Sequence, residues 1–393
     1  MKEEKYREIF KQTDVVILSS IEWNWQWSRH HRISFWFSKY FRNVYFVENI
    51  PKRVPSVREA GRVLERMGNS SRKNNVMRRY DHLLESSGNI KIITPFSLPS
   101  NNILFNSLNR HIWMKKLYNR LTVEFRVKNP FIWCYLPVQS FLDLIGLLDP
   151  EILAYDCVTN FIDDCQSPAD IEATEKKLLE IADIVTCDSD YLYKQKGKYR
   201  KDILQILPGV KYELFNKADS GPFKGEVKKV CYFGGVNNAR IDTKIIEEIA
   251  LAGFKVLIIG PVRNRIQELP REVSFTGMVE HEKIPGLLKD CDCIILPYRL
   301  GRFSEGIIPA KFFECFAAGK PIISTGIKNF LKYKDLIIIR DDGSGFVDAL
   351  RNMEKHENME KYRKRLQIAR EYSEKNRFDS LLEKMYKKLE HKR

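Results

Sequence analysis

The feature that most constrains the fold is Cys291–Thr325, where an apolar run, a loop and a helical segment follow one another. Cys291–Leu296 contains β-branched residues and is followed directly by a proline, which predicts a strand buried on both faces of a parallel sheet. Pro309 favours a helix start, because its missing N–H costs nothing in a first turn, and Gly319 suits a helix C-terminus. This order of elements predicts an α/β layered fold.

The expected helix carries an apolar and a charged side. Phe312, Phe313 and Phe316 recur at helical spacing and predict a buried stripe, whereas Lys311 and Glu314 share the opposite side. A helix N-terminus with a lysine in its first turn favours an anion such as a diphosphate. A carboxylate one turn further on can accept hydrogen bonds from both hydroxyls of a ribose. The pair therefore predicts a nucleotide site, with an ordinary solvated ion pair as the alternative.

The segment PAKFFECFAAGKPIIST resembles the donor-nucleotide motif of retaining glycosyltransferases of family 4, in particular bacterial cell-wall and capsule enzymes of the teichuronic-acid type. The resemblance implies a GT-B fold, in which two Rossmann-like parallel-sheet domains face each other across a cleft and a C-terminal helix crosses back to the first domain. It also implies that Glu314 binds the ribose of a nucleotide-sugar, with Lys311 beside it.

The same resemblance implies further donor contacts. Two glycines after the expected strand 230–233 allow close backbone approach to phosphate, and the loop that they open ends in Arg240, the expected cation for the diphosphate. Arg263 and Arg299 are reserve cations. The family's next loop contacts the base through backbone groups. The full expected binding set is Gly234, Gly235, Arg240, Gly277, Met278, Lys311 and Glu314.

The first half of the chain also resembles the teichuronic-type branch. The pattern Trp25…Arg29-His30-His31 stands where many family 4 enzymes have a glycine-rich loop, and Tyr155-Asp156-Cys157 matches a Tyr-Asp-Cys signature. Asp156 ends an expected strand, where open α/β sheets bind ligands, although a capping or turn role is the alternative. His30 is a candidate to face the reacting sugar, with a surface histidine as the alternative. We expect Arg240, Lys311, His30 and Asp156 to act in catalysis.

The alternating Trp23, Trp25 and Trp27 predict either one face of a strand extension or an aromatic platform for an acceptor sugar.

Three departures from the family pattern stand out. Many members have a second glutamate eight positions before the first, where this chain has Gly306 next to Glu305. Ile308 replaces an asparagine. No histidine follows the expected strand that starts at Phe131, where many members have one facing the sugar. An inactive glycosyltransferase-like partner subunit is therefore an alternative to an active enzyme.

Charge is concentrated in the first third of the chain. The net charge is +15, and residues 1–130 hold 24 Lys and Arg against 11 Asp and Glu. Within them, Pro51–His82 has nine basic and three acidic residues. Such a cluster attracts anionic lipid surfaces and nucleic acid alike, and a solvated loop-helix is the plain alternative. No zinc-finger or RNP spacing supports nucleic acid, so we expect no nucleic-acid partner.

Cysteine usage and hydropathy limit the remaining classes. The eight cysteines form no C-x-x-C pair and lie mostly beside apolar runs, which indicates buried free thiols. No run of about 18 apolar residues exists, and the charged N-terminus is unlike a signal peptide, so we expect a cytoplasmic protein, peripheral at the inner membrane face. We expect no cofactor beyond the nucleotide-sugar and no metal, since no convincing Asp-x-Asp pair follows a strand.

We expect an acceptor-binding domain at 1–210, a nucleotide-sugar-binding domain at 211–370 and a C-terminal helix at 371–393 that packs on the first domain through Phe378, Leu381, Leu382, Met385 and Leu389. The expected activity is transfer of a sugar from a UDP- or GDP-sugar to a glycan or lipid-linked acceptor in cell-surface polysaccharide synthesis, with retention and without metal.

Overall fold

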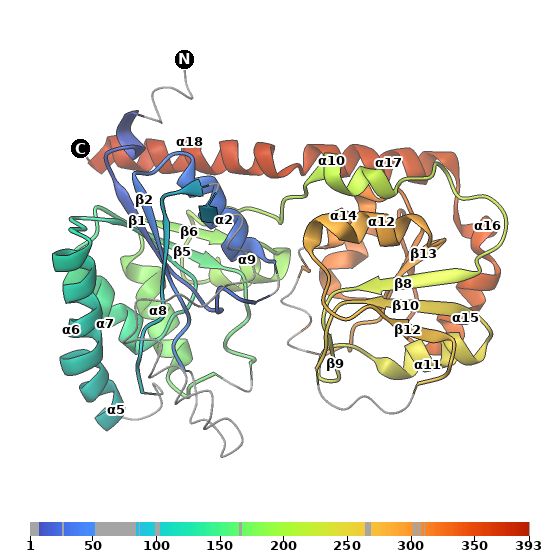
Figure 1. The fold of residues 1–393 in the computed structure, drawn as a ribbon, viewed down its shortest axis with the longest axis horizontal. Coiled ribbons are helices and arrows are strands. Elements are labelled where there is room, and N and C mark those ends of the chain that lie inside the picture. The colour runs from blue at the N-terminus through green and yellow to red at the C-terminus, as the bar shows by residue number, and fades with distance from the viewer. Residues whose placement is uncertain are drawn as a thin grey trace. The chain divides into compact units, whose positions relative to one another are not determined.

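The structure is a computed structural model that describes residues 8–25, 27–51, 84–85, 87–98, 103–164, 167–263, 269–301, 304, 308–309 and 311–392. The chain divides into two compact units (Figure 1), residues 1–206 with 378–393 and residues 207–377. Each unit has its own parallel sheet, as the alternation of apolar runs and helical segments predicts.

The first unit contains a seven-stranded sheet in the order β3-β2-β1-β4-β5-β6-β7. All of its paired strands are parallel. The strands are β1 (Asp14–Leu18), β2 (Asn43–Val47), β3 (Ile90–Ile93), β4 (Phe131–Cys134), β5 (Ile152–Cys157), β6 (Ile184–Cys187) and β7 (Leu204–Gln205). The helices that cover them include α2 (Arg29–Ser38), α5 (Ile103–Leu108), α6 (Met114–Asn119), α7 (Gln139–Leu148), α8 (Ile171–Ile181) and α9 (Asp190–Lys196).

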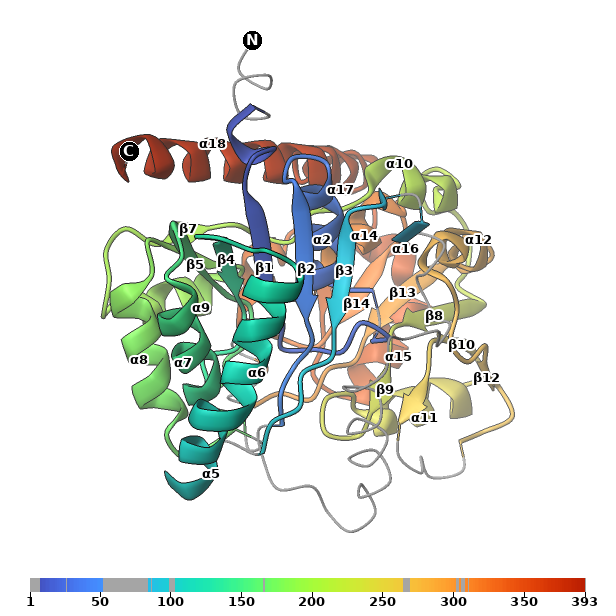
Figure 2. The same cartoon turned by 60° about the vertical axis from the view of Figure 1, so that its left-hand side comes forward.

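The strands β1, β2, β4, β5 and β6 of this sheet are buried on both faces. In β1, Val16 and Leu18 join a core with α6, α7 and α8, whereas Val15 and Ile17 join a second core with α2 and the C-terminal helix. Figure 2 shows α6 to α9 gathered on one side of the sheet and α2 on the other. This double burial explains why the strands read as continuous apolar runs.

The C-terminal helix α18 (Glu374–Lys392) packs on the first unit, as predicted. Phe378, Leu381, Leu382, Met385 and Leu389 are all buried in the second core. The ring of Phe378 stacks on Trp36 of α2, with centroids 4.6 Å apart. The end of the chain therefore completes the hydrophobic core of the first unit.

The second unit contains a six-stranded parallel sheet in the order β12-β10-β8-β13-β14-β15. The strands are β8 (Lys229–Phe233), β10 (Lys255–Ile259), β12 (Val273–Phe275), β13 (Cys293–Leu296), β14 (Ile322–Ser324) and β15 (Ile338–Ile339), and β9 (Val236–Asn237) pairs separately with β11 (Val262–Arg263). The helices are α10 (Tyr212–Phe215), α11 (Thr243–Leu251), α12 (Ile284–Lys289), α14 (Phe312–Ala317), α15 (Gly343–Arg351), α16 (Met353–His356) and α17 (Met359–Glu371).

The helix expected from Pro309 starts later than predicted. The carbonyl of Pro309 accepts a hydrogen bond from the Phe312 N–H at 2.9 Å, so a turn precedes α14 and Lys311 takes the N-cap position. Gly319 follows the helix with a φ of +68°, which confirms its predicted place at the C-terminus. Lys311 therefore lies between the loop and the helix rather than inside the first turn.

Candidate functional site

Lys311 lies at the carboxyl end of β8 among aromatic rings. Its Nζ is 3.9 Å from the centre of the Tyr232 ring and 5.8 Å from that of Tyr298, and it donates a hydrogen bond to the carbonyl of Phe233. Burial lowers the pKa of Lys311 to about 7, while the charges of Cys315 and Glu314 oppose that fall. The structure thus keeps a lysine with a lowered pKa at the end of a central strand, which is typical of functional sites.

Glycines allow the backbone to come close to this lysine. Gly234 has a φ of +127°, and a Cβ there would collide with the Lys311 ammonium. Gly260 has a φ of +142°, and a Cβ there would collide with the Gly234 carbonyl. Gly260 also forms an isolated bridge with Gly277, whose φ is +68°. Glycine adopts such backbone angles without strain, so the ends of β8, β10 and β12 form one close-packed backbone edge, called here the glycine edge.

Arg240 lies near the same rings. Its backbone carbonyl accepts a hydrogen bond from the Arg299 N–H at 2.8 Å. Burial raises the pKa of both Tyr232 and Tyr298, and the charge of Arg240 works against that rise in each case. Arg240 and Lys311 therefore both lie beside Tyr232. Arg299 lies further out, 3.9 Å from the carboxylate of Asp242.

The other binding candidates lie along this edge. The Gly235 carbonyl accepts a hydrogen bond from the Tyr232 hydroxyl at 3.2 Å, and Met278, beside Gly277, is 40% exposed. The side chain of Arg263 lies outside the described residues.

Glu314 is buried, not solvated. It is 3% exposed, and its Oε1 is 3.0 Å from Nε2 of His281, itself 8% exposed. The alternative of an ordinary solvated ion pair is therefore wrong for this carboxylate. The sequence did not predict that His281 belongs to the site. A lone histidine 33 positions before Glu314 gives no sign that the two side chains meet.

In the first unit, Asp156 at the end of β5 is 0% exposed, and both of its carboxylate oxygens accept hydrogen bonds. Arg29 donates to Oδ2 at 2.7 Å and to Oδ1 at 3.1 Å, and the Thr186 hydroxyl donates to Oδ1 at 2.6 Å. Arg29 also donates to the carbonyl of Ile206 at 3.0 Å. The carboxylate therefore orients Arg29 at the carboxyl edge of the sheet.

His30 is buried at the same edge. Its Nε2 is 2.9 Å from the Ser20 hydroxyl, and its ring stacks on Tyr135, with centroids 3.7 Å apart. Burial lowers the pKa of His30 well below its ordinary value, and the charges of His31 and Arg29 lower it further. The alternative of a surface histidine is wrong, because His30 is 5% exposed.

Asp188 follows β6 and was not singled out in the sequence. It is 6% exposed, and its Oδ1 has no hydrogen-bond partner within the described part of the chain. Burial raises the pKa of Asp188 well above its ordinary value, the charge of Arg29 opposes this, and that of Asp156 adds to it. Asp156, Arg29 and Asp188 thus form one buried charge cluster at the ends of neighbouring strands.

The tryptophans do not form one aromatic platform. Trp23 is fully buried in the core, Trp27 stacks on His31 with centroids 5.4 Å apart, and Trp25 is partly exposed. The platform interpretation is therefore wrong for Trp23.

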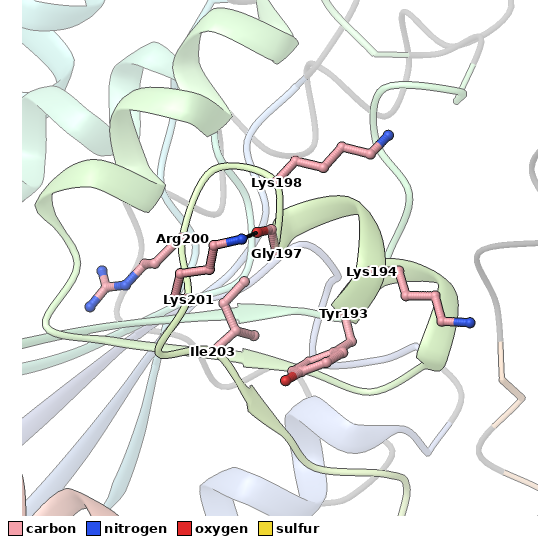
Figure 3. A pocket seen from close by; sticks show the side chains of 7 residues that line it. All are labelled: Tyr193, Lys194, Gly197, Lys198, Arg200, Lys201 and Ile203. Carbon is pink, nitrogen blue, oxygen red and sulfur yellow. Dashed lines mark hydrogen bonds between the residues drawn. The ribbon is translucent and has the colours of Figure 1, made fainter.

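A separate hollow of about 400 Å³ lies at the far end of α9 (Figure 3), where Lys201 donates to the Gly197 carbonyl at 3.3 Å. Figure 3 shows the side chains of Lys194 and Lys198 extending outward in different directions. Arg200 donates to the carbonyl of Leu179 at 3.0 Å. Lys201 and Arg200 therefore bond to carbonyls at the C-terminal ends of α9 and α8.

Other expectations fall partly outside the described residues. Glu305, Gly306, Cys165 and nearly all of the basic stretch 51–82 lie there. The seven described cysteines are buried and free. Among the described residues, no group of three or more His, Cys, Asp or Glu side chains is arranged to hold a metal, and no helix has the length and apolar content needed to cross a membrane.

Part of the chain is similar to known proteins in sequence. Residues 227–356, which include Lys311 and Glu314, match the family model described as Glycosyl transferases group 1. TuaH of Bacillus subtilis (strain 168), named as a teichuronic acid biosynthesis glycosyltransferase, is 32% identical over 178 residues, 41% of this chain. The match spans 45% of that relative, so the chain covers about half of its length.

Two solved structures match across nearly the whole chain. Anabaena Alr3699/HepE, in complex with UDP and glucose, has a TM-score of 0.66 at 11% identity and covers 95% of this chain and 100% of its own. A glycosyltransferase from Rickettsia africae ESF-5 has a TM-score of 0.60 at 13% identity, with 96% and 98% covered. The fold is thus the two-sheet GT-B fold.

Within the second unit, residues 227–356 therefore resemble the group 1 glycosyltransferases. The sequence-based prediction of the fold is confirmed, and the match of residues 227–356 supports the predicted family.

Proposed function

We propose that the chain transfers a sugar from a nucleotide-sugar donor, of the UDP or GDP type, to a glycan or lipid-linked acceptor in cell-surface polysaccharide synthesis. The observation that most supports this proposal is the position of Lys311 at the glycine edge, beside the end of β8 and inside the segment that matches the family model. The relation to TuaH supports a cell-wall product, and the UDP in the HepE structure supports a nucleotide donor.

Lys311 and Arg240 would stabilise the leaving diphosphate. When the bond to the anomeric carbon breaks, negative charge develops on the nucleoside diphosphate, and fixed cations with backbone donors lower the energy of that transition state. Gly234, Gly235, Gly277 and Met278 would let the backbone approach the phosphates and the base. Glu314 would accept hydrogen bonds from the ribose hydroxyls. We expect retention of the anomeric configuration, with these cations in place of a metal.

The first unit would hold the acceptor at the carboxyl ends of β1, β4, β5 and β6. His30 would act there as a neutral imidazole, since burial keeps its pKa low. Asp156 would act through Arg29, because its oxygens already bind Arg29 and Thr186. Arg29 then presents a fixed cation to a phosphate-linked acceptor.

The proposal is tested in two steps with the purified full chain. A thermal-shift screen of UDP, GDP and other nucleoside diphosphates should give one clear stabilising base. Hydrolysis or transfer from the matching nucleotide-sugar, with the product's anomeric configuration read by NMR, then tests the reaction. Stabilisation by a nucleotide without any turnover would favour an inactive partner subunit. A salt-dependent gel shift of nucleic acid, without nucleotide binding, would favour a nucleic-acid-binding protein.

We further propose that the first unit contacts an anionic membrane surface, where a lipid-linked acceptor would lie. Within the described residues, Leu104, Leu108 and Ile112 recur every four residues on the helical segment 103–124 and are 75%, 43% and 40% exposed. Lys115 and Lys116 are exposed next to them. An apolar row beside cations suits the boundary between anionic headgroups and acyl chains.

Vesicle flotation tests this contact. The chain should float with phosphatidylcholine vesicles that contain phosphatidylglycerol, and the triple variant L104S/L108S/I112S should not. Leu251→Ser, which changes a 70% exposed leucine in the second unit, is the matched control and should float like the parent. Failure of the parent chain to float would overturn the membrane proposal and leave the donor proposal untouched.

A further inference from the structure

Glu314 has an unusual environment for a residue that binds a ligand hydroxyl. It is 3% exposed, and a carboxylate buried without partners costs several kcal/mol. The bond of 3.0 Å between its Oε1 and His281 Nε2 supplies a partner of the right chemistry. An ionised carboxylate has about four acceptor sites, so a bond to His281 does not by itself fill it.

The position of His281 is fixed by its own surroundings. It begins the 3-10 turn His281–Lys283, which leads into α12, and it lies four residues after Gly277 at the glycine edge. Its ring packs against Phe215 of α10, with centroids 5.1 Å apart and planes at 58°. A ring held by packing keeps its Nε2 aimed in one direction, and so restricts the carboxylate to which it is bonded.

We propose that His281 is a positioning residue: it fixes the Glu314 carboxylate for the two ribose hydroxyls and thereby makes the site prefer ribonucleotides over 2′-deoxyribonucleotides. The inference rests on the proposed nucleotide-binding function. A site built to bond a hydroxyl rejects the analogue that lacks it, because its buried acceptor is then left without a donor. That rejection requires a carboxylate that cannot turn away, and His281 prevents the turn.

The test measures the affinities of UDP and 2′-deoxy-UDP, and of GDP and 2′-deoxy-GDP, by isothermal titration. The parent chain should prefer the ribonucleotide of one pair by about tenfold. His281→Leu keeps the volume and removes the donor, so ribonucleotide affinity should fall about tenfold while deoxyribonucleotide affinity stays nearly constant. His281→Gln can place an amide N–H where Nε2 lies and should retain most of the preference.

A double-mutant cycle separates positioning from a merely structural role. Glu314→Gln should also remove the preference, and H281L/E314Q should remove no more than either change alone, because the two residues act as one unit. If His281→Leu does not fold, His281→Asn, whose shorter donor cannot reach Glu314, takes its place. Equal loss for both sugars, or an unchanged preference, would overturn the inference. If the parent chain binds none of the four nucleotides, the proposed function fails as well. That result differs from failure of the inference alone, in which the parent chain binds a nucleotide but shows no effect of His281 on the preference.

Discussion

Lys311 Nζ lies 3.9 Å from the centre of the Tyr232 ring and donates to the Phe233 carbonyl, at the end of the central strand β8. Burial lowers the pKa of this lysine to about 7. Above pH 7 the free protein therefore holds Lys311 mainly neutral, although a bound diphosphate would favour its charged form.

Nucleotide binding should consequently take up a proton. Between pH 7 and 9 the affinity for the preferred nucleoside diphosphate should fall, by up to about tenfold per pH unit, because an increasing fraction of Lys311 must be protonated on binding. Titration calorimetry at pH 8 in phosphate and in Tris should give different apparent enthalpies. Lys311→Arg stays charged and should lose both effects. Buffer-independent enthalpies in the parent chain would contradict the assignment.

Gly234→Ala should impair nucleotide binding. The residue has a φ of +127°, and a Cβ would displace the Lys311 ammonium, so we expect a destabilisation of about 1–3 kcal/mol and a marked loss of affinity. The matched control is Gly286→Ala in α12, where a Cβ meets no atom within 4 Å, and which should be neutral or slightly stabilising. Thermal unfolding and calorimetry check both variants, and equal behaviour of the two would be inconsistent with a tight glycine edge.

Asp156→Ala should destabilise the first unit strongly. It removes a fully buried carboxylate and leaves Arg29, whose side chain is 13% exposed, without its ionic partner. Breaking such a pair costs about 3–5 kcal/mol, whereas Glu124→Ala, which breaks an exposed pair with Arg120, should cost about 0.5 kcal/mol or less. Urea midpoints followed by tryptophan fluorescence measure the difference. Similar midpoints for the two variants would mean that the Arg29 contact contributes little.

Asp188→Asn should stabilise the protein in a pH-dependent way. The pKa of Asp188 is raised above that of the unfolded chain, so the folded state holds a proton that the unfolded state loses above about pH 4. Stability from this group is therefore lost as pH rises from about 4 through the raised pKa, and asparagine avoids the loss. The midpoint of thermal unfolding should rise at pH 7 and change little below pH 4.

Asp202→Asn is the control of opposite sign. The hydrogen bond from Arg200 lowers the pKa of Asp202, so its contribution is present above about pH 4 and is lost as pH falls through the lowered pKa. This variant should be less stable than the parent at pH 7. Stabilisation by both asparagines would point to a general loss of negative charge rather than to the environment of Asp188.

The longer strands were predictable because each is buried on both faces and therefore reads as an apolar run. Val44–Val47, for example, was predicted and β2 spans Asn43–Val47. The two-residue strands β7, β9 and β11 carry no such signal. The start of α14 was misplaced because Pro309 suits a turn before a helix as well as a first helical turn.

The candidate site was predictable only where the motif is local. Lys311 and Glu314 lie in one short segment, but the partner of Glu314 is His281, and the partner of Asp156 is Arg29, 127 residues earlier. Such contacts depend on strand order and helix packing, which no spacing in the sequence reports. The sequence did not predict a role for Asp188, because a lone aspartate after a strand is typical of a helix cap. Its burial is seen only in the structure.

The central claim is that Lys311 and Glu314 hold the two ends of a nucleoside diphosphate. Its most direct test is titration calorimetry of the preferred nucleotide with Lys311→Ala and Glu314→Ala, with circular dichroism to verify the fold. Each change should remove a charge-assisted contact of about 1.5–3 kcal/mol and so weaken binding about tenfold or more. Parent-like affinity in both folded variants would contradict the account.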